Sequence, residues 1–382
     1  MKILHTSDLH IGKKLMGRER FLEYRSIFIE LSDVCEKEGV ELVLIAGDVY
    51  DTFTPPAEAE EIFYQGVKLL SKRCAVLVIS GNHDDYVRLT AASALAEEHN
   101  VYIVGNDLKP VSCKKRGEVY PEKSGKGWVI FKNSAGERVY INTLPYPNEA
   151  RFKEGRSDET FEEKTKRWIA LGEAGKAEKI PSVFLSHIFV AGGSVSDSER
   201  EIDLGGARAV SLDNLPDCDY CALGHLHKKQ KLGKNAYYCG APMQFTFDES
   251  GSKKSVNVFD LTANGVENFK EVELVSAKKL VRLQANGVVD GVALLNANKE
   301  YYVELTLNLK EPMTQQESKA LHEVENLLSL KAEVQNAEVN YEKFSNKNKS
   351  SSQLFTDYYK LRYGTEVPEE LLALFLSLTE EE

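Results

Sequence analysis

Five short polar motifs end apolar runs in the first 230 residues, and their side chains could hold metal ions. They are Asp8-Leu9-His10, Gly47-Asp48, Gly81-Asn82-His83-Asp84, Ser186-His187 and Gly224-His225-Leu226-His227. This set of imidazole, carboxylate and amide ligands has no thiolate, so it suits manganese, iron or zinc better than calcium or a sulfur-rich structural zinc site. A pair of such ions can assist in-line displacement at phosphorus, so the motifs predict hydrolysis of a phosphate ester.

Each motif lies at or just past the carboxyl end of a short apolar run of strand length. These runs are residues 2–7, 41–46, 75–80, 182–186 and 219–223. Ligands of open α/β sheets collect at this edge, so the motifs would meet in one crevice if the strands lay side by side and parallel. Asp48 follows a glycine at a central strand end, which makes it the candidate for a carboxylate shared by two ions.

A single motif of this kind has a simpler explanation. One aspartate after a strand, such as Asp8 or Asp51, is usually a turn residue or a helix cap. One histidine in apolar surroundings is more often a core residue than a ligand. Asp84 in particular could cap the helix that follows it. The ordered set of five motifs is what favours a metal site.

Apolar spacing predicts further elements around these strands. We expect helices at 18–38, 57–72 and 158–173, a hairpin from 128–131 and 138–144, and strands of a second sheet at 236–240, 255–261 and 266–275. The predicted fold of residues 1–276 is therefore α/β, with two central sheets flanked by helices.

Two smaller parts follow residue 276. Residues 277–343 predict an α+β domain, with strands at 280–285, 301–308 and 333–341 and a helix at 314–330. Residues 344–353 form a polar linker. The helical segment 354–382 carries apolar residues that we expect to bind a partner rather than the chain's own catalytic domain, the alternative occupant. They include Leu354, Phe355, Tyr358, Leu371, Leu372 and Phe375.

The composition agrees with a cytoplasmic enzyme. Of 382 residues, 42% are hydrophobic and 28% charged, as in ordinary globular proteins. The N-terminus has no signal-peptide pattern, and no apolar run approaches the roughly 20 residues of a membrane span. The six cysteines, among them Cys218 and Cys221, indicate free thiols in a reducing compartment.

If the predicted phosphate ester is part of a nucleic acid such as DNA, the net charge of −11 is unexpected. Basic residues nevertheless follow the first and last motifs: Lys13, Lys14, Arg18 and Lys228. They could contact DNA or simply form solvated charged loops. Bound divalent ions would add positive charge, and the overall acidity suggests that a partner supplies part of the grip on DNA.

The motifs in this order resemble the calcineurin-like metallophosphoesterase superfamily, and within it the SbcD family of bacterial nuclease subunits. The segments that carry the narrower resemblance are ILHTSDLHIGK, LIAGDVYDTFTPP, VISGNHDD, LSHIFVAGG and ALGHLHKKQ. The resemblance extends over nearly the whole chain. All five motifs in order make a specific signal, whereas any one alone would be weak.

The resemblance implies a role for each motif residue. The implied ligands are Asp8, His10 and His227 for one ion, Asn82, His187 and His225 for the other, and Asp48 for both. His83 would face the scissile phosphate and stabilise the transition state or protonate the leaving oxygen, while Asp84 would orient His83 or a ligand. Archaeal and eukaryotic relatives usually carry a further histidine where this chain has Asp51, so that role is not transferred.

The same resemblance implies a DNA nuclease with two Mn²⁺, with Mg²⁺, Fe²⁺ or Zn²⁺ as alternatives. Its reactions would be double-strand exonuclease and single-strand or hairpin endonuclease cleavage, in DNA repair, recombination and replication. It would form a homodimer through helices that include 57–72, and would join a coiled-coil ATPase of the SbcC type in a heterotetramer of two subunits of each kind. Residues 277–343 would cap the active site. A metallophosphoesterase for small molecules or phosphoproteins, or a non-catalytic scaffold, remains the alternative.

Overall fold

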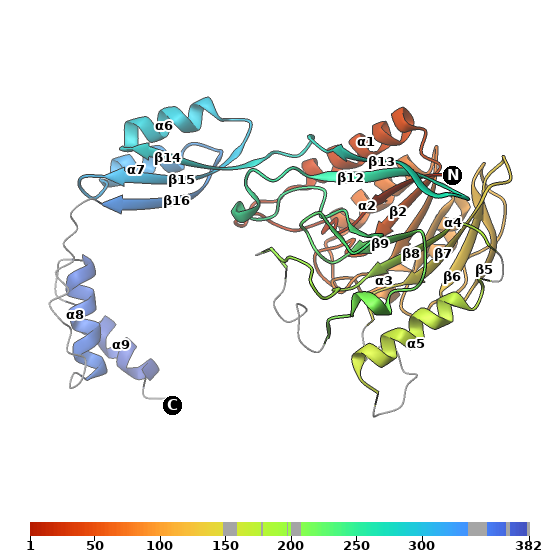
Figure 1. The fold of residues 1–382 in the computed structure, drawn as a ribbon. Coiled ribbons are helices and arrows are strands. Elements are labelled where there is room, and N and C mark those ends of the chain that lie inside the picture. The colour runs from red at the N-terminus through yellow and green to blue at the C-terminus, as the bar shows by residue number, and fades with distance from the viewer. Residues whose placement is uncertain are drawn as a thin grey trace. The chain divides into compact units, whose positions relative to one another are not determined.

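The computed structural model of the chain describes residues 1–147, 159–176, 179–196, 198–199, 208–334, 350–363 and 367–379. Contacts divide the chain into two compact units, Met1–Glu333 and Val334–Glu382. Figure 1 labels most of the helices and many of the strands. Among the described helices, none combines the length and the apolar character that crossing a bilayer requires.

The first sheet has six strands in the order β13-β12-β1-β2-β3-β4. Their bounds are β1 Lys2–Thr6, β2 Leu42–Ala46, β3 Ala75–Ile79, β4 Val101–Val104, β12 Ser255–Thr262 and β13 Gly265–Glu273. Strands β1 to β4 run parallel, and β12 pairs antiparallel with β1. Helices α1 (Phe21–Glu38) and α2 (Ala57–Leu70) share a core with one face of this sheet. The short helices α3 (Tyr86–Leu89) and α4 (Ser93–Glu98) lie between β3 and β4 in the sequence.

The second sheet has seven strands in the order β10-β11-β9-β8-β7-β6-β5. Their bounds are β5 Tyr120–Gly125, β6 Trp128–Lys132, β7 Arg138–Leu144, β8 Ser182–His187, β9 Tyr220–Gly224, β10 Gln230–Leu232 and β11 Ala236–Tyr238. Strands β7, β8, β9 and β11 run parallel to one another. Helix α5 (Phe161–Glu173) begins at a capping box of Thr160 and Glu163 and buries Trp168 against this sheet.

The two sheets share a core between them. Ile3, Leu44 and Leu77 of the first sheet belong to the same buried cluster as Val183 and Leu185 of the second. Both faces of these strands are covered, which explains why they appear in the sequence as continuous apolar runs rather than as alternating patterns. The structure confirms the predicted α/β fold, in which two central sheets are flanked by helices (Figure 1).

The predicted strand partners were partly wrong. The strands predicted at 255–261 and 266–275 lie in the first sheet, where Phe259 pairs with Ile3, and not in the second. The five strands that precede the motifs are also divided between the two sheets instead of lying side by side in one. Apolar periodicity identifies a strand but not its neighbour, and β12 satisfies the backbone groups that β1 would otherwise expose at an edge.

The third sheet is small and lies near the end of the first unit. It contains β14 (Leu280–Asn286), β15 (Tyr302–Leu309) and β16 (Leu327–Val334), in that order, with helices α6 (Val288–Ala297) and α7 (Gln315–His322). The sequence did not predict α6, which provides the crossover between the parallel strands β14 and β15.

The predicted helix 314–330 was too long. It ends at His322, and residues predicted to continue it form the start of β16. The buried Asn326 side chain explains the break, because its amide donates to the carbonyls of Leu295 at 3.0 Å and Asn298 at 2.8 Å. Most of the strand predicted at 333–341 lies outside the described residues.

Specific contacts attach the third sheet to the first. Tyr302 of β15 packs in one cluster with Leu15 and Phe247, and its hydroxyl donates to Glu23 at 3.1 Å. The buried Arg20 forms an ion pair with Glu23 at 2.7 Å. Both contacts come from residues close behind the first motif.

The second unit contains α8 (Ser351–Tyr363) and α9 (Glu369–Thr379). The rings of Phe355 and Phe375 stack with their centroids 4.1 Å apart, so two of the residues predicted to bind a partner pack against each other. Tyr358 is 57% exposed and Leu371 is 37% exposed. The predicted linker 344–353 lies mostly outside the described residues, and its last three positions belong to α8.

Candidate metal centre

The five motifs converge where the carboxyl ends of strands from both sheets meet. The amide of Asp8 donates to the carbonyl of Gly47 at 3.1 Å within the first sheet. Across the two sheets, the amide of His225 donates to Asp8 Oδ1 at 2.9 Å, and His187 Nδ1 donates to the carbonyl of Ala46 at 2.8 Å. All five of these residues are buried. The motif residues therefore meet at the joint between two sheets, not at the edge of one.

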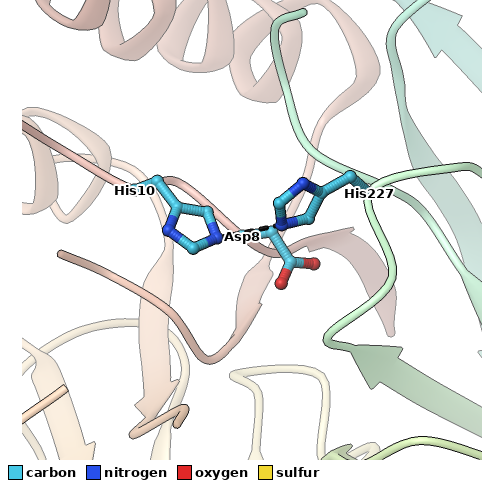
Figure 2. A group of neighbouring side chains, drawn as sticks. All are labelled: Asp8, His10 and His227. Carbon is cyan, nitrogen blue, oxygen red and sulfur yellow. Dashed lines mark hydrogen bonds between the residues drawn. The ribbon is translucent and has the colours of Figure 1, made fainter. Parts of the chain in front are cut away.

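Asp8, His10 and His227 make one group of possible ligands (Figure 2). The Nε2 atoms of His10 and His227 face each other at 3.0 Å. Within the described part of the chain, Asp8 Oδ2 has no hydrogen-bond partner although it is buried. Two facing imidazole nitrogens and an unsatisfied carboxylate oxygen are a poor arrangement by themselves, and a cation between them would satisfy all three.

Asn82, His187 and His225 make the second group. Asn82 Oδ1 lies 2.8 Å from His187 Nε2 and 3.1 Å from His225 Nδ1. The carbonyl of Ala46 accepts the hydrogen bond from His187 Nδ1, so Nε2 is the ring nitrogen that can serve as a ligand atom. Burial lowers the pKa of His187, but Asp48 and Asp8 outweigh it and raise this pKa to about 9, so a bound cation would replace the proton on Nε2. This group therefore offers an amide oxygen and imidazole nitrogens to a second cation.

Asp48 lies between the two groups. Its Oδ2 is 3.4 Å from His10 Nε2 and also 3.4 Å from His187 Nε2. Its Oδ1 accepts a hydrogen bond from the amide of His83 at 2.9 Å, which fixes the carboxylate. One oxygen of Asp48 thus faces both ligand groups, as a bridging carboxylate would.

The electrostatics of the centre fit bound cations. Burial raises the pKa of Asp8 to about 7, and the neighbouring Asp48 adds to that shift while His187 opposes it. Burial would also raise the pKa of Asp48, but the neighbouring His187, through its charge and its hydrogen bond, contributes most to bringing this pKa well below its usual value. Burial lowers the pKa of His10 to about 4, which keeps that ring neutral and able to act as a ligand. Divalent cations would compensate the two buried carboxylates.

Several of these residues have an unusual backbone conformation. The φ angles are 53° for Asp8, 46° for His10, 48° for Asp48 and 104° for His225, all in the region that favours glycine. The surrounding structure holds these turns, for example through the hydrogen bond from the His10 amide to the Asp48 carbonyl at 3.0 Å. Backbone strain of this kind concentrates at functional sites.

The glycines of the motifs allow the strand ends to approach closely. A Cβ atom on Gly224 would lie 1.8 Å from the carbonyl oxygen of Ala46, and one on Gly81 would lie 2.1 Å from Asp48 Oδ1. Neither distance is sterically possible. The glycine before His225 is therefore required for the contact between the two sheets, and Gly81 is required for the position of the bridging carboxylate.

His83 and Asp84 occupy different surroundings. His83 is 6% exposed, its Nδ1 donates to the Asp51 carbonyl at 2.7 Å, and its ring meets the edge of His10 with centroids 4.6 Å apart. The buried Asp84 accepts hydrogen bonds from the amides of Gly81, Val49 and Tyr50 at 2.8, 3.1 and 3.0 Å. Asp84 therefore joins the loop of Asp48 to the loop of His83.

Asp84 is not the cap of the following helix. The N-cap of α3 is Asp85, whose carboxylate accepts from the amide of Val87 at 2.9 Å. The helix-cap explanation that the sequence allowed for Asp84 was therefore wrong by one residue.

The basic residues predicted to contact DNA have different surroundings. Lys13 Nζ lies 3.2 Å from Asp51, and Lys14 Nζ lies 2.6 Å from Glu19. Arg18 pairs with Glu325 at 2.9 Å, beside the third sheet. Lys228 is exposed directly after His227. Of these four residues, only Lys228 directly follows a motif histidine. It is exposed and forms no ion pair with another described residue.

Two residues beside the centre gave no signal in the sequence. Ser198 Oγ lies 2.5 Å from His227 Nδ1, and Glu199 Oε1 accepts from the His227 amide at 2.7 Å. They orient the ring so that Nε2 faces His10. No apolar pattern or motif precedes them, and they reach His227 only through tertiary contact.

Comparison with known proteins agrees with this geometry. The family described as calcineurin-like phosphoesterase matches residues 1–229. The SbcD subunit of the SbcCD nuclease from Bacillus subtilis (strain 168) is 35% identical, over 99% of this chain and 97% of its own length. The SbcD subunits of two other bacteria are also similar. That of Rhodobacter capsulatus is 31% identical over 75% of this chain and 72% of its own, and that of Escherichia coli (strain K12) is 25% identical over 75% and 71%.

Proposed function

Because this chain belongs to the calcineurin-like phosphoesterases, and among them to the SbcD family of nuclease subunits, we propose that it is a metal-dependent DNA nuclease subunit. The observation that carries the proposal is the Asp48 oxygen that faces ligand groups from both sheets at 3.4 Å. The reactions would be exonuclease cleavage of duplex ends and endonuclease cleavage of single strands or hairpins, in DNA repair, recombination and replication.

We assign the ligands from the two groups. Asp8, His10 and His227 would hold one ion, Asn82, His187 and His225 the other, and Asp48 both. Nitrogen and oxygen ligands of this kind support Mn²⁺ as the ion, with Mg²⁺, Fe²⁺ or Zn²⁺ as alternatives. Two divalent ions, when bound, supply an activated water and offset the charge that develops on the phosphate.

His83 is assigned to proton transfer. The Asp51 carbonyl accepts from its Nδ1 at 2.7 Å, which leaves Nε2 as the atom that can exchange a proton. We infer that Nε2 protonates the leaving oxygen of the DNA strand. Asp84 positions His83 indirectly, through its hydrogen bonds to the loops on both sides of the centre.

The partners are proposed from the family and the second unit. We assign the exposed apolar residues of α8 and α9 to a coiled-coil ATPase like SbcC, in a heterotetramer of two subunits of each kind, and α2 to a homodimer contact. The third sheet would cap the active site. A cytoplasmic location agrees with its cysteines, all of which are free.

Comparing the rates at which the protein hydrolyses different phosphate esters tests the substrate class. With Mn²⁺ added, the protein is expected to cleave end-labelled hairpin and linear duplex DNA, and to act poorly on cyclic nucleotides and phosphopeptides. The comparison is run with and without the ATPase partner. Preferential hydrolysis of the cyclic nucleotides or phosphopeptides would replace DNA as the substrate, and no Mn²⁺-dependent hydrolysis of any ester would indicate a scaffold.

Removing residues 350–382 tests the partner assignment. The truncated chain is expected to keep its Mn²⁺-dependent nuclease activity, because the centre lies within the first unit, and to lose co-purification with the SbcC-like ATPase. In the full chain, Tyr358→Ser should weaken that binding because its ring is 57% exposed. Gln353→Ala, an exposed polar position on the same helix, is the matched control. Undiminished ATPase binding by the truncated chain would contradict the assignment.

A further inference from the structure

A groove of about 540 Å³ lies beside His227 and carries four lysines. We propose that it holds the phosphate backbone of the DNA strand on the His227 side of the metal centre. The inference rests on the proposed nuclease function and names the residues that would position its substrate. Its lining comes from Val195 and Ser196, from His227 to Lys229, from Cys239 and from residues of the segment 248–254.

The groove is lined by more lysines than carboxylates, although the net charge of the chain is −11. Its lysines are Lys228, Lys229, Lys253 and Lys254, and its acidic residues are Asp248 and Glu249. Asp248 already pairs with Arg282 at 2.7 Å, and Glu249 pairs with Lys254. Both carboxylates are thus compensated by cations, so the remaining lysines determine the charge that an approaching ligand meets. A polyanion is the ligand that such a groove favours.

The lysines differ in how available they are. Lys228 is exposed, and no carboxylate in the described part of the chain forms an ion pair with its ammonium. Lys229 and Lys253 are exposed and pair with Glu271 and Glu273 of β13. Exposed pairs of this kind contribute little, so a phosphate can replace the carboxylate.

Lys254 has a different role. Its side chain is only 10% exposed and donates to the carbonyl of His227 at 3.1 Å. It is therefore a positioning residue that fixes the segment of His227, and the backbone contacts are left to Lys228, Lys229 and Lys253.

The groove and the centre have one residue in common, His227. This residue lines the groove, and its Nε2 lies 3.0 Å from His10 Nε2. Ser198 and Glu199 follow the lining residue Ser196 in the sequence. Ser198 contacts Nδ1 of the His227 ring and Glu199 accepts a hydrogen bond from the His227 amide, so the two residues hold His227 in place. A strand with one phosphate at the centre can therefore place its neighbouring phosphates among the lysines. Contacts of this kind position a nucleic acid without reading its sequence.

The test measures binding of a nuclease-resistant phosphorothioate oligonucleotide, single-stranded or duplex, to the Mn²⁺-loaded protein at several salt concentrations. Lys228→Gln is expected to weaken binding several-fold, independently of base sequence. It should also reduce the slope of log affinity against log salt by about 0.9 for duplex and about 0.7 for single-stranded DNA, the value of one phosphate contact. Glu273→Gln should have the opposite effect on affinity, because it releases Lys253 and removes a negative charge.

Lys234→Gln is the matched control. This lysine is also exposed, but it precedes β11 and lines a separate cavity with Cys218, at the end of the sheet away from the centre. It should bind DNA like the unmodified protein. Thermal unfolding of each variant verifies that it is folded.

If Lys228→Gln and Lys253→Gln both bind DNA with the affinity and the salt slope of the unmodified protein, the groove assignment is wrong. Hydrolysis of bis(p-nitrophenyl) phosphate by the unmodified protein separates this failure from failure of the proposed function. If that small diester is hydrolysed with Mn²⁺ while the lysine variants bind DNA normally, only the groove is refuted. If neither the diester nor DNA is hydrolysed, the nuclease proposal itself fails, and the groove assignment fails with it.

Discussion

Asp48→Asn is expected to lower Mn²⁺-dependent DNA cleavage by at least about 10³-fold, because losing the charge stabilisation from a metal ion costs several kcal/mol. The substitution is nearly isosteric. Its amide oxygen can keep the hydrogen bond from the His83 amide, which Oδ1 accepts at 2.9 Å. An amide nitrogen would then replace Oδ2, the atom that faces His10 and His187 at 3.4 Å, and cannot bridge two ions.

The bound metal is the measurement that distinguishes a bridging ligand from a structural residue. Asp48→Asn should bind less Mn²⁺ per chain by elemental analysis while retaining its circular dichroism spectrum. Asp51→Asn is the matched control in the same loop, since Asp51 contacts His10 Nδ1 at 3.3 Å from behind the centre. Asp51→Asn is expected to lower DNA cleavage by about 10–100-fold, as expected for a residue that orients a ligand. Full metal content and full activity in Asp48→Asn would refute the bridging role.

The convergence of the motif residues could be predicted because their chemistry and their position in the sequence coincide. Asp8 and Asp48 each follow a strand that is short and apolar, and in the structure both are buried at the strand ends. The glycine of another motif, Gly81, is required for a steric reason that the sequence only hinted at, namely its close contact with Asp48. Residues that act through another side chain had no such signal. Ser198 and Glu199 contact His227 from a segment without any regular pattern.

The fold was predictable to the level of elements and layers but not of strand partners. The runs before the motifs match β1, β2, β3, β8 and β9 to within about one residue, as expected for buried parallel strands. Strand β12 was assigned to the wrong sheet, because an apolar pattern indicates that a strand is buried but does not identify the strand beside it. Here that neighbouring strand is β1. The helix prediction for 314–330 was wrong at its carboxyl end. Asn326, a polar residue in the pattern, is buried there and donates hydrogen bonds to carbonyls that are distant in the sequence.

The division of the ligands between two sheets has a consequence for stability. His187 and His225 come from the second sheet, whereas Asp8 and Asp48 come from the first. At this joint, hydrogen bonds such as the one from the His225 amide to Asp8 add to the apolar core that the two sheets share. Ions bound across this joint would bind the folded state and not the unfolded one, so they stabilise the arrangement of the sheets as well as supplying the chemistry.

His83→Ala is expected to leave the metal content unchanged and to lower DNA cleavage by about 10²–10⁴-fold, the usual contribution of a general acid. The metal measurement is necessary because His10, Asp48 and His83 also have ligand atoms within 4.8 Å of one another. Loss of Mn²⁺ from the variant would make His83 a ligand and contradict the assignment.

The leaving group decides what His83 does when the metals stay bound. The leaving alkoxide of a DNA strand needs a proton, whereas nitrophenolate leaves without one. If His83 Nε2 donates that proton, His83→Ala should slow DNA cleavage far more than hydrolysis of bis(p-nitrophenyl) phosphate. Equal losses on both substrates would instead mean that the ring stabilises charge on the phosphate itself. The hydrogen bond from Nδ1 to the Asp51 carbonyl favours proton transfer, because it holds the ring in one orientation with Nε2 as the exchanging atom.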